Sequence, residues 1–168
     1  MHLTGQLAEH IVPSDKQEAR EATMAVNRPE EIEEIKKLKA RYFRYLDTKR
    51  WKEFGEVFAK DAVSRSPTSN EVMAQGRQAI VERVKGVVRD AVTVHYGHMP
   101  EIELTSETTA KGLWSMFDFV DYGKSSWKGY GHYEEEYVKQ GGRWYIKSFK
   151  LTRLRQDKHD QSAMGTTP

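Results

Sequence analysis

The sequence predicts an α+β fold in which N-terminal helices pack on one face of a curved antiparallel sheet. Between residues 29 and 88, apolar side chains recur three and four positions apart, which is typical of amphipathic helices. Between residues 92 and 155, apolar and polar residues alternate over long stretches, as they do in half-buried strands. Helices followed by a meander of strands indicate an α+β domain rather than repeated βαβ units.

Three helices are predicted, over residues 29–48, 51–58 and 77–88. Pro29 suits the first turn of the first helix, and acidic residues follow it at the positive end of the helix dipole. The apolar face of this helix centres on Ile35, Tyr42 and Leu46. Tyr42 therefore points toward the interior.

Four long strands are predicted after the helices, at residues 92–105, 109–122, 129–139 and 143–155. Gly141 and Gly142 form a hairpin signal between the last two strands. A shorter strand begins at Asp61, and a polar loop follows it at residues 67–70.

The length of 168 residues predicts one domain with a sizeable core. Residues 1–27 carry few aliphatic side chains in no clear period. We therefore expect a flexible arm at residues 1–28, a folded domain at residues 29–155 and a disordered tail at residues 156–168.

Charge and composition exclude several classes of function. The 27 basic and 25 acidic residues give a net charge of +2, so no concentrated basic face indicates nucleic-acid binding. No apolar run is long enough to span a membrane, and the N-terminus lacks the apolar core of a signal peptide, so we expect a cytoplasmic protein. The absence of cysteine excludes disulfides, thiol nucleophiles and cysteine-ligated metals.

Polar residues that could share a cavity lie at the end of the first helix and on the strands. Asp47 lies about 140° around the helix from Tyr42, so the two border one cavity only if the helix end overhangs it. His95 and His98 point to opposite faces of their strand unless Gly97 bends the chain. This separation also argues against a metal site formed by the two histidines.

Asp118 is unusual because it shares a strand face with Trp114 and Met116. A carboxylate on an apolar face needs a partner, and Arg153 on a later strand is a candidate. His132 is a further candidate on the strand between them. We expect Arg153, His132, Trp114 and Met116 to contact a substrate.

Each candidate also has a purely structural alternative. Tyr42 could be a core tyrosine with a backbone partner, and Asp47 could cap the following helix. His95 alone could be a satisfied core histidine, and Arg153 could only neutralise Asp118. We expect His98 to bond the backbone near Pro100.

Several motifs together carry a resemblance: Tyr42-x4-Asp47, Phe58-Ala-x-Asp61-Ala62, His95-x-Gly97-His98-x-Pro100-Glu101, Trp114-x3-Asp118 and Arg153. In this order they resemble the SnoaL-like branch of the nuclear-transport-factor-2-like superfamily, over about residues 29–155. They are most similar to the motifs of bacterial bile-acid 7α-dehydratases. The pair of Asp47 and His95 also resembles the dyad of scytalone dehydratase and lindane dehydrochlorinase. Residues 63–90 show little correspondence, which leaves the substrate open.

The resemblance implies a cone-shaped barrel with a deep apolar pocket, usually trimeric although a dimer is an alternative, without metal or organic cofactor. In the dehydratases, the positions matching Tyr42, Asp47, His95 and Asp118 are catalytic, and Arg153 matches an arginine near the pocket. The expected partners are a small hydrophobic molecule and further copies of the chain.

These residues suit an elimination reaction. Histidine titrates near neutral pH, so His95 can remove a carbon-bound proton while Asp47 holds its tautomer. Tyr42 can donate to a leaving hydroxyl or to an adjacent carbonyl, and Asp118 can bind a substrate hydroxyl or act as a second acid. We expect a dehydratase-like lyase acting on a steroid-like, bile-acid-like or aromatic substrate. The alternatives are a ketosteroid-isomerase-like isomerase or polyketide cyclase, and a binding protein without catalysis.

Overall fold

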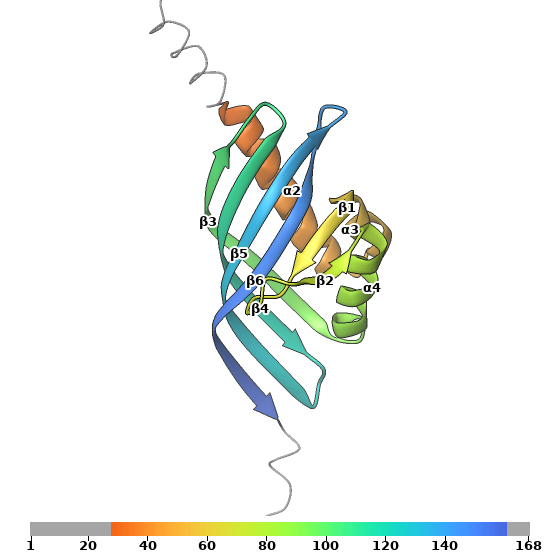
Figure 1. Cartoon of the computed structure of the whole chain (residues 1–168). Coiled ribbons are helices and arrows are strands. Elements are labelled where there is room, and N and C mark those ends of the chain that lie inside the picture. Colours follow the sequence, from red (N-terminus) through yellow and green to blue (C-terminus); the bar gives the residue numbers. More distant parts are fainter. Residues whose placement is uncertain (1–27, 161–168) are drawn as a thin grey trace, which may run out of the picture.

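The computed structural model describes residues 28–160, which form three helices and a six-stranded sheet (Figure 1). The helices are α2 (Pro29–Asp47), α3 (Trp51–Glu56) and α4 (Arg77–Val88). The strands are β1 (Phe58–Arg65), β2 (Val72–Gln75), β3 (Val92–Leu104), β4 (Thr109–Asp121), β5 (Ser125–Gln140) and β6 (Arg143–Asp160). Residues 1–27 of the predicted arm and residues 161–168 of the predicted tail lie outside the described residues, whereas residues 156–160 of that tail belong to β6.

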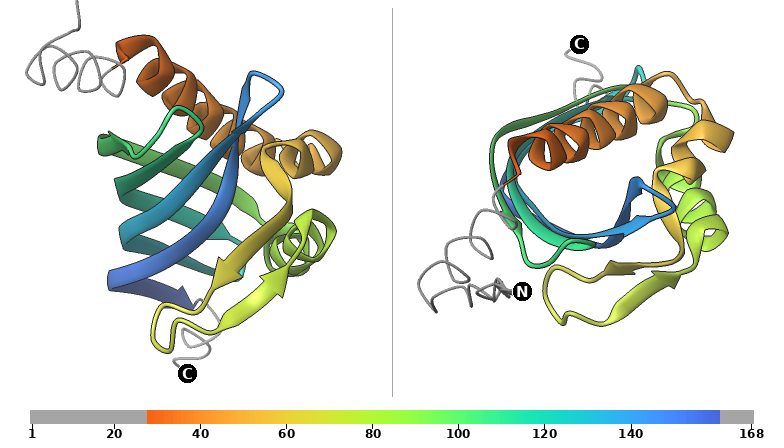
Figure 2. Two further views of the ribbon diagram at one scale, coloured as in Figure 1. Left: turned by 45° about the horizontal axis from the view of Figure 1, so that its top comes forward. Right: turned by 90° about the horizontal axis from the view of Figure 1, so that it is seen from above.

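The sheet has the strand order β2-β1-β6-β5-β4-β3 and does not close into a barrel. Strands β3 to β6 form the predicted antiparallel meander, whereas β1 pairs with β6 in parallel. The sheet curves around α2, which lies along its concave face, and α4 lies beside β1 and β2 (Figure 2). The expected cone-shaped α+β architecture is therefore confirmed.

The core lies between α2 and the concave face of the sheet. Five side chains of α2 are buried: Ile35, Leu38, Tyr42 and Leu46 of the predicted apolar face, and Lys39. Inward-facing residues of the central strands complete the core, and alternate positions along β4 and β5 are buried. This alternation is why the sequence predicted β4 to within one residue, whereas β5 begins four residues before its predicted start.

The structure differs from the sequence prediction at several element ends. The second helix ends at Glu56, and the strand predicted near Asp61 already begins at Phe58. Strand β2 was not predicted, because its four edge residues are mostly exposed and show no alternation. Strand β6 continues to Asp160, five residues beyond the predicted end, because it pairs with the start of β5 at Ser125.

No helix among residues 28–160 is long and apolar enough to cross a membrane.

Candidate active site

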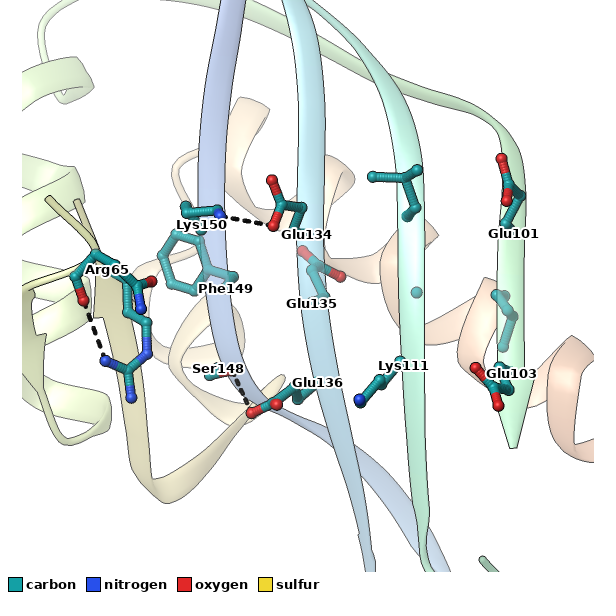
Figure 3. A pocket seen from close by; sticks show the side chains of 14 residues that line it. Arg65, Glu101, Glu103, Lys111, Glu134, Glu135, Glu136, Ser148, Phe149 and Lys150 are labelled. Carbon is teal, nitrogen blue, oxygen red and sulfur yellow. Dashed lines mark hydrogen bonds and ion pairs between the residues drawn. The ribbon is translucent and has the colours of Figure 1, made fainter. Parts of the chain in front are cut away.

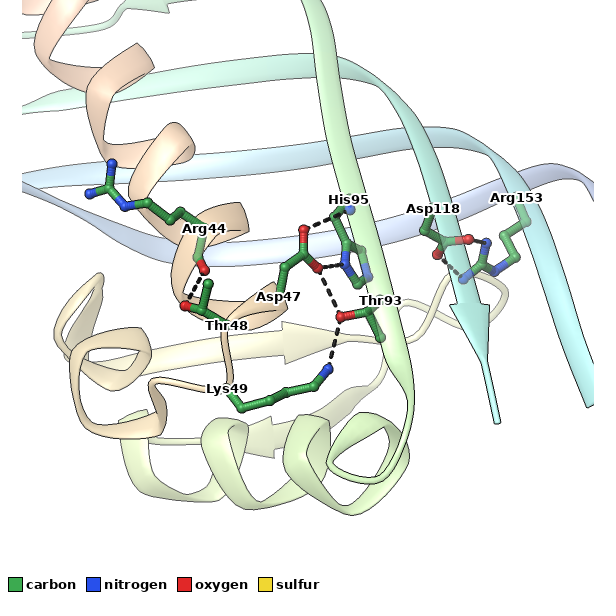
Figure 4. Close-up of polar contacts among 8 residues, drawn as sticks. All are labelled: Arg44, Asp47, Thr48, Lys49, Thr93, His95, Asp118 and Arg153. Carbon is green, nitrogen blue, oxygen red and sulfur yellow. Dashed lines mark hydrogen bonds and ion pairs between the residues drawn. The ribbon is translucent and has the colours of Figure 1, made fainter. Parts of the chain in front are cut away.

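Asp47 and His95 are in direct contact, as the sequence predicts. Asp47 is the last residue of α2, and His95 lies on β3 with 7% of its surface exposed. The His95 Nδ1 atom lies 2.6 Å from Asp47 Oδ1, and the backbone N–H of His95 donates to Asp47 Oδ2 over 2.9 Å (Figure 4). Two bonds from one residue fix the carboxylate relative to the imidazole ring.

The position of the ring proton follows from this arrangement. A carboxylate accepts hydrogen bonds and donates none, so the bond to Asp47 requires a proton on His95 Nδ1. In the neutral imidazole, Nε2 is then unprotonated and can accept a proton. The contact therefore gives His95 the tautomer that a general base needs.

A chain of hydrogen bonds continues behind the carboxylate. The Thr93 hydroxyl donates to Asp47 Oδ1 over 2.9 Å, and Lys49 Nζ lies 2.8 Å from the same hydroxyl oxygen (Figure 4). Thr93 is on β3, two residues before His95, and Lys49 is in the corner after α2. Neither residue was singled out from the sequence, because nothing local indicates their contact.

His95 borders a cavity of about 310 Å³ on the concave side of the sheet. Tyr42, Asp118 and Arg153 line the same cavity, as do Tyr133 and Trp127 from β5. Apolar residues of α2, α4 and the sheet supply much of the remaining wall: Leu46, Ile80, Val84, Val88, Val120 and Leu151. The predicted catalytic residues other than Asp47 thus line the same, largely apolar cavity.

Asp47 does not line this cavity. It borders a second cleft of about 440 Å³ between α2 and β3, and His95 lines both hollows. The cause is the angular offset from Tyr42 along the helix, which turns Asp47 away from the concave side. The sequence left open whether Asp47 and Tyr42 border one cavity, and the structure shows that they line different ones, with His95 lining both.

The Tyr42 side chain is buried among aromatic rings. Burial raises the pKa of its phenol well above the usual range, and the charge of Glu135 adds to this effect. Burial likewise raises the pKa of Tyr133, whose hydroxyl bonds that of Tyr42. Tyr42 therefore stays protonated at neutral pH and can act as a hydrogen-bond donor in the cavity.

Asp118 and Arg153 form a bidentate ion pair. Arg153 Nη1 and Nη2 donate to the two Asp118 oxygens over 3.0 and 2.6 Å, and Asp118 is 2% exposed (Figure 4). Gly129 on β5 leaves room for this pair, since a Cβ atom there would lie 1.8 Å from Arg153 Nη1. A carboxylate held in this way is an acceptor for a ligand hydroxyl.

Of the four residues predicted to contact substrate, Arg153 is the one whose side chain lines this cavity. Trp114 is buried, borders the second cleft and donates to the Tyr137 hydroxyl over 2.8 Å. Met116 is buried in the core. His132 lies opposite Ser115 and Thr152 in the sheet. Side chains alternate along a strand, so His132 points to the convex side while its neighbour Tyr133 points to the concave side.

Lys39 was missed by the sequence analysis, although it lies in the apolar stripe of α2. It is fully buried, and its Nζ atom bonds the buried carboxylate of Glu135 on β5. The same Nζ lies 3.6 Å from the centre of the Tyr133 ring and 4.1 Å from that of Tyr42. A lysine three residues before an inward tyrosine was the signal that could have revealed it.

Trp127 was missed because the third of the four long strands was predicted to begin at residue 129, four residues after β5 begins. It lines the cavity from the extra residues of β5. Within residues 28–160, its buried Nε1 atom has no hydrogen-bond partner. Trp127 therefore brings a donor without a partner among the described residues to the wall of the cavity.

A third hollow of about 760 Å³ lies on the convex face of the sheet (Figure 3). Its lining is strongly charged and includes Glu101, Glu103 and the ion pair of Glu134 with Lys150. None of the predicted catalytic residues lines it. No group of three or more metal-ligating side chains occurs among the described residues.

The sequence of this chain matches a model of the SnoaL-like domain family over residues 27–150. The match covers well over half of the chain, so the protein belongs to the SnoaL-like domain family.

Solved structures share this fold. A Novosphingobium aromaticivorans protein, provisionally described as a scytalone dehydratase, aligns with a TM-score of 0.67 and 26% identity, covering 76% of this chain and 86% of that chain. The hexachlorocyclohexane dehydrochlorinase LinA-type3 from Novosphingobium barchaimii aligns with a TM-score of 0.63 and 16% identity, covering 86% and 92%. Rv3472 from Mycobacterium tuberculosis, a protein of unknown function, aligns with a TM-score of 0.66 and 24% identity, covering 74% and 72%.

Proposed function

We propose that this protein is a cofactor-independent lyase that eliminates water, or another β-leaving group, from a hydrophobic substrate. The observation that carries the proposal is the 2.6 Å contact of His95 with Asp47, made by a histidine that lines an apolar cavity. The names of two structural neighbours, a protein provisionally described as a scytalone dehydratase and a dehydrochlorinase, point to the same class of reaction.

In the proposed reaction, His95 Nε2 removes a proton from a carbon next to a carbonyl group. The electron pair of the C–H bond forms the new double bond, and the bond to the leaving hydroxyl breaks. The Tyr42 hydroxyl donates to the carbonyl oxygen as charge develops there. The proton held by His95 leaves with the hydroxyl as water, which restores the neutral base.

The pair of Asp118 and Arg153 then has a binding role. Both carboxylate oxygens of Asp118 already accept from Arg153, so Asp118 is better suited to accept from a substrate hydroxyl than to donate a proton. This assignment favours the first of the two roles that the sequence left open for Asp118.

The proposed substrate is a steroid-like, bile-acid-like or aromatic ketone with a β-hydroxyl group. The cavity of about 310 Å³ is at the small end of the range for ligand pockets, and apolar side chains form much of its wall. The closeness to bile-acid 7α-dehydratases stays a prediction.

Replacement of His95 by alanine tests the proposal, with His98→Ala as the matched control. His98 lies on the same strand but is exposed. With β-hydroxy ketones of steroid and aromatic type, His95→Ala should lose about 10²–10⁴-fold in turnover and keep its ligand affinity. Loss of 18 mass units in the product distinguishes elimination from isomerisation. Equal turnover of His95→Ala and the wild type would overturn the proposal.

A further inference from the structure

The hydrogen bonds that link Lys49, Thr93 and Asp47 have only one possible order of donors and acceptors. Lys49 Nζ is a donor and never an acceptor, so the Thr93 oxygen accepts from it. The single hydroxyl proton of Thr93 is thereby directed to Asp47 Oδ1. Asp47 then accepts from the Thr93 hydroxyl, from the His95 backbone and from the His95 ring.

We infer that Thr93 and Lys49 are positioning residues, which hold the Asp47 carboxylate so that His95 keeps its proton on Nδ1 and leaves Nε2 free. The carboxylate has two oxygens, and the three donors occupy both of them from different directions. Without the Thr93 donor, the carboxylate can rotate about its own bond and release the ring nitrogen. The inference rests on the proposed function, because the tautomer of His95 affects turnover only when His95 is the base.

The backbone at Lys49 supports a role for its side chain. Its φ angle is +59°, in the left-handed region that disfavours residues with a Cβ atom. Lys49 is the second residue after α2, where helices commonly place glycine for this conformation. The chain instead carries a long cationic side chain here, and that side chain reaches across the helix end to β3.

A simpler explanation of Lys49 is that a cation is favourable near the negative end of a helix. That explanation requires no particular partner on β3. The two explanations differ in what they predict for the ring of His95, since a dipole effect acts on helix stability and leaves the tautomer unchanged.

The test is the tautomer of His95, measured by long-range ¹H–¹⁵N correlation spectra of the full chain with ¹⁵N-labelled histidine. The His95→Ala spectrum assigns the signals. In the wild type at a pH where the ring is neutral, Nδ1 should be protonated and Nε2 not. Thr93→Val replaces the hydroxyl by a methyl group. It should raise the ratio of the Nε2-protonated to the Nδ1-protonated tautomer of His95 at least fivefold. Thr93→Ser, which keeps the hydroxyl, should match the wild type.

Lys49→Met should also raise this ratio, at least twofold, whereas Lys52→Met should not. Lys52 is an exposed lysine on α3 and serves as the matched control. Unchanged tautomers in both Thr93→Val and Lys49→Met would overturn the inference, and so would equal changes in Thr93→Val and Thr93→Ser. The measurement uses no substrate, so its failure is distinct from failure of the proposed lyase, which is judged by turnover alone.

Discussion

Replacement of Gly129 by alanine should separate the ion pair in the cavity. A Cβ atom on Gly129 would lie 1.8 Å from Arg153 Nη1 and 2.2 Å from Asp118 Oδ1. Contacts shorter than 3.0 Å are not tolerated, so both groups must move, Arg153 Nη1 by about 1.2 Å and Asp118 Oδ1 by about 0.8 Å. Asp118 is buried and has a short side chain, so the longer, partly exposed side chain of Arg153 takes the larger displacement.

The expected cost follows from the burial of the pair. Loss of the partner of a buried charge costs about 3–5 kcal/mol. Arg153 is partly exposed, so water recovers part of that loss, and alanine is about 0.5–1 kcal/mol better than glycine within a strand. We therefore expect Gly129→Ala to lower the free energy of unfolding by about 2–3 kcal/mol, taking these terms together.

Gly86→Ala is the matched control. Gly86 lies in α4, and a Cβ atom there would meet no atom within 4 Å. This substitution should stabilise the protein by about 0.8–1 kcal/mol through helix propensity. Urea unfolding followed by tryptophan fluorescence measures both variants.

A double-mutant cycle with Arg153→Ala locates the cause. In that background Gly129→Ala should cost about 1 kcal/mol or less, because the closest clashing group is gone. A Gly129→Ala protein within 0.5 kcal/mol of the wild type, or an equal cost in both backgrounds, would refute the reasoning.

Three further predictions concern buried polar groups. Lys39→Met should lower the free energy of unfolding by about 3–5 kcal/mol because it leaves the buried charge of Glu135 without a cation, and the double variant Lys39→Met/Glu135→Leu should recover most of it in urea unfolding. An additive loss in the double variant would contradict this. Burial raises the pKa of three tyrosines, namely Tyr42, Tyr133 and Tyr137. Their contribution to stability is complete below pH 10 and falls above it, by up to about 4 kcal/mol per pH unit, because the unfolded chain releases protons that the folded chain keeps. Urea unfolding and tyrosinate absorbance between pH 9 and 12 measure this, and flat stability across that range would contradict it. Trp127→Phe should weaken binding of an oxygen-bearing ligand about 5–10-fold by removing the free Nε1 donor, whereas a hydrocarbon of the same shape should lose less than about twofold. Equal losses for both ligands, measured by calorimetry, would contradict the assignment.

Much of the secondary structure could be predicted because its signals are local. Helix α2 begins at Pro29 as predicted, and α4 has the predicted bounds. Strands β3, β4 and β6 begin at the predicted residues, since alternation and turn signals mark them. Strand β2 and the parallel pairing of β1 with β6 have no such signal, because edge strands and chain crossovers depend on distant partners.

The candidate site shows the same division. The inward direction of Tyr42 and the contact of Asp47 with His95 could be predicted from helix and strand parity together with the family resemblance. The pairing of Lys39 with Glu135 could not, because the two are 96 residues apart in sequence. The register of β5 decided that Trp127 lines the cavity and that His132 lies on the convex side.

The sequence by itself determined which residues lie on which face of each helix and strand, and therefore which side chains are candidates for the interior. Only the tertiary structure decided that His95 lines two cavities and that Thr93 and Lys49 continue the hydrogen bonds from Asp47. The physical reason is that periodicity fixes the direction of a side chain about its own element, whereas its partner is fixed by how the elements pack against one another.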